Sequence, residues 1–304
     1  MNEDYKSNNF SRRTFLNRLS GLAASSVLLS APYVLYGNNK MNLTVQHVID
    51  TILKEIPGAP FAKTVDQLRT GRMEQVVTGI VTTMFPTIEV IEKTAAAGAN
   101  MIIAHETPFY DNNDETDWLQ TDNVYKYKLL LLDKHKIAVW RFHDYWHAHK
   151  PDGIIMGNLV KLQWEKLYNT ENERFITLPV PMTVGDIVKH AKHKLQIPSV
   201  RVVGNLQQSC SKIYLAFGYM DSRRQIAAIQ KFNPDLILSG ETREWETVER
   251  VRDGQLIGNK TSLIVLSHAV SEEAGMEYAA QWLSTKVPGV SVNHIASTNP
   301  FQFI

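Results

Sequence analysis

Residues 76–105 read VVTGIVTTMFPTIEVIEKTAAAGANMIIAH, and this segment indicates the class of fold to expect. The β-branched run Val76–Thr83 predicts a buried strand, and Met101–Ala104 predicts a second, shorter strand. Between them, Pro86 suits the first turn of a helix and Gly98 suits its end. A strand, a helix and a strand in this order predict two parallel strands joined by a helical crossover.

The same alternation continues along the chain. Further strand-like runs occur at residues 137–142, 200–204, 211–218, 235–239, 262–267 and 290–295, and helical segments separate most of them. We expect Phe175–Pro181 to be a connector. The sequence therefore predicts an α/β fold with two similar halves, mixed or parallel sheets and flanking helices. We expect the halves to be residues 41–170 and 171–304.

The net charge and the cysteine content exclude several classes of function. The chain has 32 Lys and Arg against 31 Asp and Glu, a formal charge of +1. Nucleic-acid binding through counterion release usually needs a basic surplus, so we expect no nucleic-acid partner. The single cysteine, Cys210, excludes an intramolecular disulfide and a cysteine-based zinc site.

The N-terminal residues predict an export signal. Ser11–Leu16 reads SRRTFL and is followed by the apolar stretch Leu19–Tyr36, so residues 1–37 resemble a twin-arginine (Tat) signal peptide. The alternative, an uncleaved anchor, is weakened by Ser, Gly and Pro32 within the stretch. We therefore expect a periplasmic or otherwise exported protein without a stable membrane span in its mature form. Tat exports folded proteins, often with a cofactor already loaded, which favours a bound metal.

Three predicted strands end in histidine. Met101–Ala104 leads into His105 and Glu106, the strand at 137–142 leads into His143, and that at 262–267 leads into His268. Ligand sites of open α/β sheets lie outside the carboxyl ends of the strands. We therefore expect these side chains to form one site.

More candidate ligands surround these histidines. Asp144, His147 and His149 follow His143, and Glu272 lies four residues after His268, on one helical face. Imidazoles and carboxylates bind Zn²⁺, Mn²⁺, Fe²⁺ or Co²⁺, and bridging carboxylates can hold two ions about 3.5–4 Å apart. Taken alone, each residue is more simply interpreted as a structural histidine, as part of a solvated loop or as one member of a pair on a helix face. Three clusters at equivalent strand ends favour a shared site.

These motifs resemble the Nif-three-like family, the GTP cyclohydrolase I type 2 homologues, over about residues 43–304. The segments that carry the resemblance are Ala95–Phe109, His143–His147, Asp235–Glu241, His268–Glu272 and Thr298–Phe301. The resemblance implies a toroidal homo-hexamer with a dinuclear metal centre. Carried over by position, it implies as metal ligands His105, Glu106, His147, His268 and Glu272.

The chain departs from the family pattern at three places. Glu106 replaces a histidine and His147 replaces an aspartate, so the set keeps three imidazoles and two carboxylates. The segment Gly218–Ser222 has fewer glycines than the family's turn, and fewer glycines make close backbone approach to a phosphate harder. This departure disfavours a nucleoside triphosphate as the substrate.

Such a site suits a hydrolase that acts on a small-molecule amide, cyclic amidine or phosphoester. Glu241, Glu244 and His143 are candidates for the catalytic acid or base, although each could be only a helix-start or loop residue. The alternative function is a non-catalytic metal-binding hexameric scaffold or a protein whose hexamer binds a partner without turnover. A serine or cysteine hydrolase is disfavoured because the chain has no Gly-x-Ser-x-Gly elbow and one cysteine.

Overall fold

The computed structural model describes residues 43–302 and residue 304. The predicted signal peptide, residues 1–37, lies outside the described residues. Among the helices that are described, none has the length and apolar character needed to cross a membrane.

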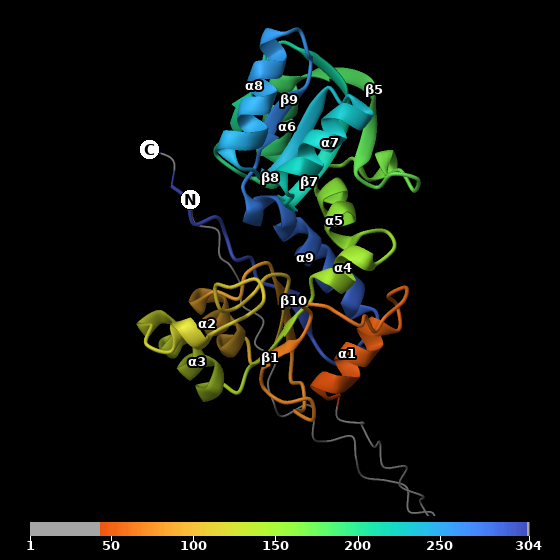
Figure 1. Ribbon diagram of the computed structural model, residues 1–304. Helices are drawn as coiled ribbons and strands as arrows, with labels where there is room; N and C mark the ends of the chain where they lie inside the picture. The colour runs from red at the N-terminus through yellow and green to blue at the C-terminus, as the bar shows by residue number, and fades with distance from the viewer. Residues whose placement is uncertain (1–42, 303) are drawn as a thin grey trace, which may run out of the picture. The chain divides into compact units, whose positions relative to one another are not determined.

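The first sheet has the strand order β1-β4-β3-β2-β10. Its strands are β1 (Leu68–Thr70), β2 (Ile80–Thr83), β3 (Met101–Ala104), β4 (Ala138–Arg141) and β10 (Val292–His294). Strands β10, β2, β3 and β4 are parallel, and β1 pairs with β4 in the antiparallel sense. The βαβ unit expected from residues 76–105 is therefore present at the centre of this sheet (Figure 1).

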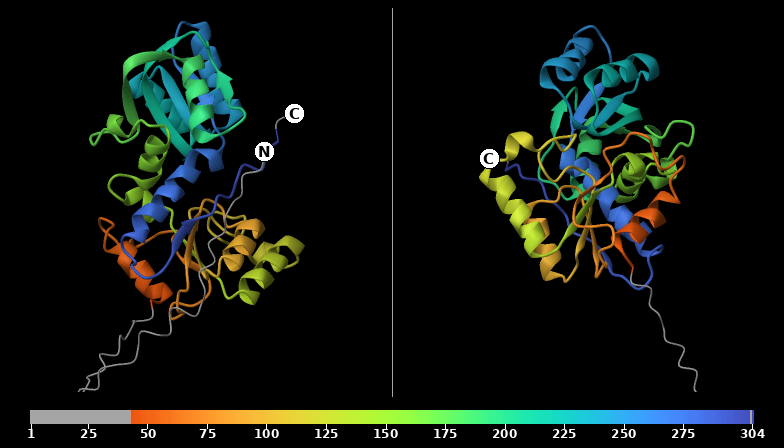
Figure 2. Two further views of the ribbon diagram at one scale, coloured as in Figure 1. Left: turned by 180° about the vertical axis from the view of Figure 1, so that it is seen from behind. Right: turned by 60° about the horizontal axis from the view of Figure 1, so that its bottom comes forward.

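The second sheet has the order β5-β7-β8-β9-β6. Its strands are β5 (Phe175–Thr183), β6 (Arg201–Val203), β7 (Ser209–Tyr219), β8 (Leu236–Glu241) and β9 (Ser262–Val265). Strands β7, β8 and β9 are parallel, and β5 and β6 close the edges in the antiparallel sense. Two five-stranded mixed sheets with flanking helices confirm the predicted fold class (Figures 1 and 2).

Helices cover both sheets and join them into one unit. They are α1 (Val45–Leu53), α2 (Ile88–Ala96), α3 (Asn123–Lys134), α4 (Asp144–Ala148), α5 (Gly153–Lys161), α6 (Val184–Leu195), α7 (Ser222–Phe232), α8 (Glu249–Leu256) and α9 (His268–Ser284). Two 3₁₀ turns, η1 (Asp117–Leu119) and η2 (Glu165–Leu167), and a π-helix, η3 (Glu244–Val248), complete the described elements.

Helix α9 lies between the two sheets and packs against α5 and against strands of both sheets. Its buried residues Met276, Ala279 and Leu283 belong to a hydrophobic core that includes Ile103 of β3 and Leu238 of β8. The chain then returns to the first sheet as β10. The residues expected as a C-terminal half, 171–304, therefore contribute a strand to the N-terminal sheet.

One sequence expectation is wrong: Phe175–Pro181 is a strand and not a connector. Strand β5 lies at the edge of its sheet, and its pairing with β7 is interrupted between Thr177 and Met182. Pro179 and Pro181 fall in this interruption, where the missing amide hydrogens cost no ladder bond. Proline in the sequence therefore concealed an edge strand.

Candidate metal centre

The candidate ligands follow strands of both sheets. His105 and Glu106 come directly after β3, and His143 precedes the short helix α4, which carries His147. His268 begins α9 after β9, and Glu272 lies one turn along that helix. The five residues that the family resemblance implied as ligands thus meet at the carboxyl ends of parallel strands.

Three imidazoles form a first group, which we call the imidazole group: His105, His143 and His147. One ring nitrogen from each lies within 4.8 Å of the others. The rings of His105 and His143 stack with centroids 4.6 Å apart, and the ring of His147 meets both edge-on. Three convergent nitrogens are a donor set suited to a transition metal.

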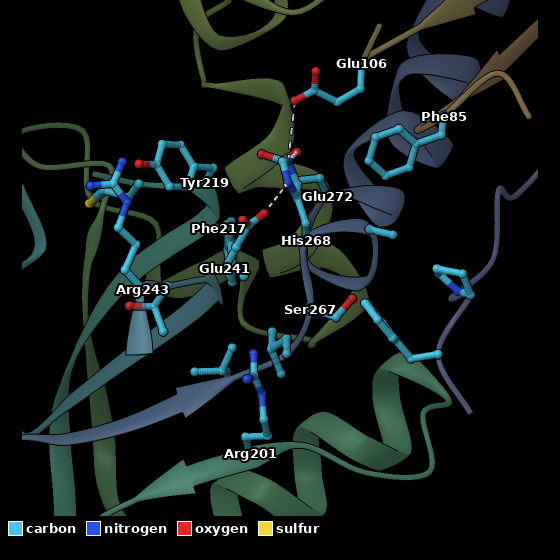
Figure 3. A pocket seen from close by; sticks show the side chains of 18 of the residues that line it. Phe85, Glu106, Arg201, Phe217, Tyr219, Glu241, Arg243, Ser267, His268 and Glu272 are labelled. Atoms are coloured by element: carbon cyan, nitrogen blue, oxygen red, sulfur yellow. Dashed lines mark hydrogen bonds and ion pairs between the residues drawn. The ribbon is translucent and has the colours of Figure 1, made fainter. Parts of the chain in front are cut away.

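A second group, the carboxylate group, contains Glu106, His268 and Glu272, whose donor atoms also lie within 4.8 Å of one another. The Nε2 atom of His268 is 3.1 Å from Oε2 of Glu272 and 3.5 Å from Oε1 of Glu106 (Figure 3). One imidazole and two carboxylates can also bind a divalent cation.

The two groups adjoin. Nε2 of His105 lies 3.5 Å from Oε2 of Glu272, and Nε2 of His143 lies 4.0 Å from Oε1 of Glu106. Each carboxylate of the second group therefore faces an imidazole of the first, which is the position a bridging carboxylate would need.

His105 gives the strongest sign that the groups fit a metal. Its side chain is fully buried, and Nδ1 donates to the backbone oxygen of Phe142 at 3.1 Å. That donation leaves the lone pair on Nε2, which is buried without a hydrogen-bond partner. A buried, unsatisfied acceptor in a structured site needs an explanation, and a coordinated cation supplies one.

The other imidazoles are oriented by carboxylates. His143 Nδ1 lies 2.9 Å from Asp144, and His147 Nδ1 lies 3.0 Å from Asp152. His268 Nδ1 lies 2.9 Å from Oε2 of Glu241. Because a carboxylate accepts, each of these Nδ1 atoms must carry a proton. Nε2 of His143 and of His147 is thereby left for the site, whereas Nε2 of His268 faces the carboxylate of Glu272.

Sequence reasoning missed Arg141, the last residue of β4. Its guanidinium is completely buried and donates to Oε2 of Glu106 at 2.6 Å, while the backbone oxygen of Asn112 accepts a second bond. This ion pair holds the Glu106 carboxylate in place. A signal was present, because an arginine within an apolar strand requires a buried anion.

Two further positioning residues escaped notice. Asp66 accepts hydrogen bonds from the amides of His143, Asp144 and Tyr145 and so holds the start of α4. Asp152 caps α5 through one oxygen while the other accepts from His147. Among the remaining candidates, His149 donates from Nδ1 to the backbone oxygen of Pro151 and belongs to neither group.

Opposite charges perturb the titration of the carboxylate group. Burial alone would raise the pKa of Glu106, but the His268 imidazole and other nearby cationic groups lower it to about 2. Burial alone would lower the pKa of His268, but three surrounding carboxylates raise it to about 12. They belong to Glu106, Glu241 and Glu272. The excess of carboxylates over imidazole here favours a bound cation.

Two glycines allow α9 to approach the second sheet. A Cβ atom on Gly218, which has a φ of +64°, would overlap the Glu272 carboxylate, and one on Gly240 would overlap Ser271. Gly218, the first residue of the segment 218–222, thus leaves room for the side chain of the candidate ligand Glu272.

The site opens into a cavity of about 1740 Å³ that both sheets line. Glu106, His143 and His147 line it from the first sheet and its loops. Two of the expected acid–base candidates also line it, Glu241 at the end of β8 and Glu244 at the start of η3. The cavity is large enough for a small-molecule substrate.

Comparison with known proteins identifies a family. Residues 44–300 match the family model described as Duf34/NIF3 (NGG1p interacting factor 3). A protein from Clostridium perfringens described as "GTP cyclohydrolase 1 type 2 homolog" is 25% identical over 250 residues, which cover 78% of this chain and 90% of that protein.

Solved structures share the fold. A Bacillus cereus protein related to NIF3 superposes with a TM-score of 0.68 at 17% identity, over 86% of this chain and 99% of the other. A Staphylococcus aureus protein gives a TM-score of 0.66 at 19% identity with the same coverage. HcgD from Methanocaldococcus jannaschii gives 0.60 at 16% identity, over 83% and 97% of the two chains.

Proposed function

The chain belongs to the Duf34/NIF3 family, and from this premise we propose that it is a metal-dependent hydrolase with a dinuclear centre. The observation that carries the proposal is the pair of adjoining ligand groups, with the buried, unsatisfied Nε2 of His105 between them. The imidazole group would hold one divalent ion and the carboxylate group a second. We propose Zn, Mn, Fe or Co as the metal, because these ions accept mixed imidazole and carboxylate ligands.

The proposed ligands are His105, Glu106, His147, His268 and Glu272, and the geometry adds His143 to the imidazole group. The replacement of a family histidine by Glu106 is compensated locally, since Arg141 neutralises the added carboxylate. His147 takes the place of a family aspartate and gains Asp152 as its hydrogen-bond partner.

Bound divalent ions would supply Lewis-acid chemistry, lowering the pKa of water in the site and stabilising negative charge on the substrate. Within the chain, Glu241 is the proposed acid or base: one of its oxygens accepts the Nδ1 proton of His268, and its half-exposed side chain lines the cavity. His143 also lines the cavity and was expected in the same role, but its place in the imidazole group favours a ligand.

We propose an amide, cyclic amidine or phosphoester as the scissile group. The name of the Clostridium perfringens relative favours a cyclic amidine, the class opened by a GTP cyclohydrolase. Export through the twin-arginine route, a periplasmic location and a homo-hexamer are also proposals, which rest on residues 11–36 and on the family resemblance.

The test measures metal content by mass spectrometry and hydrolysis across a panel of amides, cyclic amidines and phosphoesters. We expect two ions per wild-type chain and fewer in His105→Asn and His147→Ala, with hydrolysis lost in both. His193→Asn is the matched control, because His193 is exposed on α6, away from both groups.

Unchanged metal content in the two ligand variants would contradict the proposed centre. Two ions without turnover of any compound would instead favour the alternative, a metal-binding scaffold.

A further inference from the structure

The outer part of the cavity carries a second chemical feature, which we call the arginine wall: Arg201, Tyr219, Arg243 and Trp245. The strand register places it at the carboxyl-terminal ends of β8 and β9 in the second sheet. Arg201 pairs with Val265 at the end of β9, and Tyr219 pairs with Glu241 at the end of β8. The wall thus lies at the same strand ends that lead into His268.

The two arginines are not committed to buried partners. Nη1 of Arg201 pairs with Glu244 at 2.6 Å, and these side chains are 59% and 71% exposed. Nη1 of Arg243 is 3.5 Å from Glu246, with both side chains at least one-third exposed. Exposed ion pairs of this kind contribute little stability, so a bound anion can replace either carboxylate.

Aromatic surface accompanies these cations. The guanidinium of Arg243 lies 5.9 Å from the centre of the Tyr219 ring, and Figure 3 shows the two side by side. Trp245, in the π-helix η3, is 74% exposed although it lines the cavity. Exposed rings next to guanidinium groups provide flat surfaces on which a planar ring can stack.

The cavity has carboxylates at the metal centre and exposed guanidinium groups at the arginine wall. Carboxylates surround His268 in the metal centre, while the arginine wall offers cations farther out. A substrate with its own anionic group therefore finds attraction at the wall and repulsion near the carboxylates of the centre. This separation would orient the substrate with its charged end outward.

We propose that the arginine wall binds an anionic group, a phosphate or a carboxylate, attached to a planar ring of the substrate. Arg243 binds the anion, and Tyr219, against which its guanidinium lies, stacks on the ring together with Trp245. Arg201, three strands from Tyr219 in the sheet, adds positive charge to the wall. This assignment rests on the proposed hydrolase function, because only an enzyme has a substrate. The binding of the anion itself requires no turnover.

The test is calorimetric binding to the metal-loaded full chain and to the same protein after chelation. The probes are phenylphosphonate and benzoate, which combine a ring with an anion, and benzyl alcohol and methylphosphonate, which each lack one feature. We expect the ring-bearing anions to bind at least tenfold more tightly than the other two. Comparison of phenylphosphonate with benzoate distinguishes a phosphate-like from a carboxylate-like ligand.

Arg243→Gln should weaken binding of the preferred anion at least tenfold, and Tyr219→Leu should remove its advantage over methylphosphonate, the probe without a ring. The matched control is Arg252→Gln, since Arg252 also forms an exposed ion pair, with Glu249, but does not line the cavity. We expect less than a twofold change there.

Binding that is equal in the arginine variant and in the wild type would overturn the proposal, as would equally tight binding of benzyl alcohol. Binding that follows these expectations in a protein without bound metal or hydrolysis would support the arginine wall and contradict only the hydrolase function.

Discussion

At the scale of single residues, the site depends on buried groups whose partners fix their charge. Glu106 is held by the fully buried Arg141, and the imidazoles are held by Asp144, Asp152 and Glu241 through Nδ1. Each partner determines which atom of its neighbour remains free for a cation. Removing a partner should therefore affect both stability and metal binding.

Arg141→Met should destabilise the chelated protein by about 3–5 kcal/mol, because it leaves the Glu106 carboxylate buried without its guanidinium. Lys161→Met is the control, since the ion pair of Lys161 with Glu277 is more exposed and should contribute about 1 kcal/mol or less. Urea unfolding of both variants measures the difference. Equal losses would contradict a stabilising role for the buried pair.

Lys128 on α3 predicts a pH dependence away from the site. Burial lowers the pKa of Lys128 to about 8 from 10.5, and its ammonium donates to the backbone oxygen of Pro108. Between these two values the unfolded chain binds more protons than the native one, so this group makes stability rise with pH.

We therefore expect Lys128→Met to be more stable than the wild type at pH about 7, and the advantage to shrink by pH about 10. Unfolding at both pH values measures it, and taking the difference between the proteins cancels other titrating groups, such as Cys210. An advantage that stays constant or grows with pH would show that the lysine is not held in this way.

At the scale of elements, helix α9 matters most, because it carries His268 and Glu272 and packs against both sheets. Its first turns reach the centre because β7 and β8 carry glycines, Gly218 and Gly240, directly before their last residues, at the points of contact. The strand ends and the start of α9 form one close-packed corner.

Gly218→Ala should lower the metal content, because its Cβ would displace the Glu272 carboxylate. Gly98→Ala is a close control: its φ of +69° imposes a similar backbone strain, of about 1–2 kcal/mol, but nothing lies within 4 Å of the added carbon. Metal analysis and thermal unfolding separate the two effects. If both variants keep the full complement of ions, close packing at Gly218 is not what positions Glu272.

Many of these strands and most of the site could be predicted from the sequence, because apolar runs that lead into histidine indicate where a strand ends and a ligand begins. Thr44 and Thr183 cap α1 and α6 with a residue type that is favoured at helix N-termini. Strand β5 was hidden by its prolines, and β1 has only three residues. Orienting partners such as Asp152, or the backbone oxygen of Phe142, could not be predicted, because tertiary packing and not local pattern brings them to the imidazoles.

At the scale of the whole molecule, the proposed export depends on residues outside the described structure. Replacing both Arg12 and Arg13 by lysine should leave the protein in the cytoplasm, since the twin-arginine pair is the proposed recognition element. Cell fractionation followed by immunoblotting measures this. Arg18→Lys is the control within the same segment, and export of the double variant at the wild-type level would contradict the assignment.

The return of the chain to the first sheet as β10 has a consequence for how such proteins can be altered. Along the chain, all strands of the second sheet lie between β4 and β10 of the first sheet. A cut between residues 170 and 171 therefore leaves the N-terminal fragment without its edge strand β10. A chimera that exchanges residues 171–266 as a cassette would instead keep both chain ends in their sheet and retain the three clustered imidazoles. We expect such cassette exchange, rather than fragment complementation, to be the practical way of giving this scaffold a new specificity.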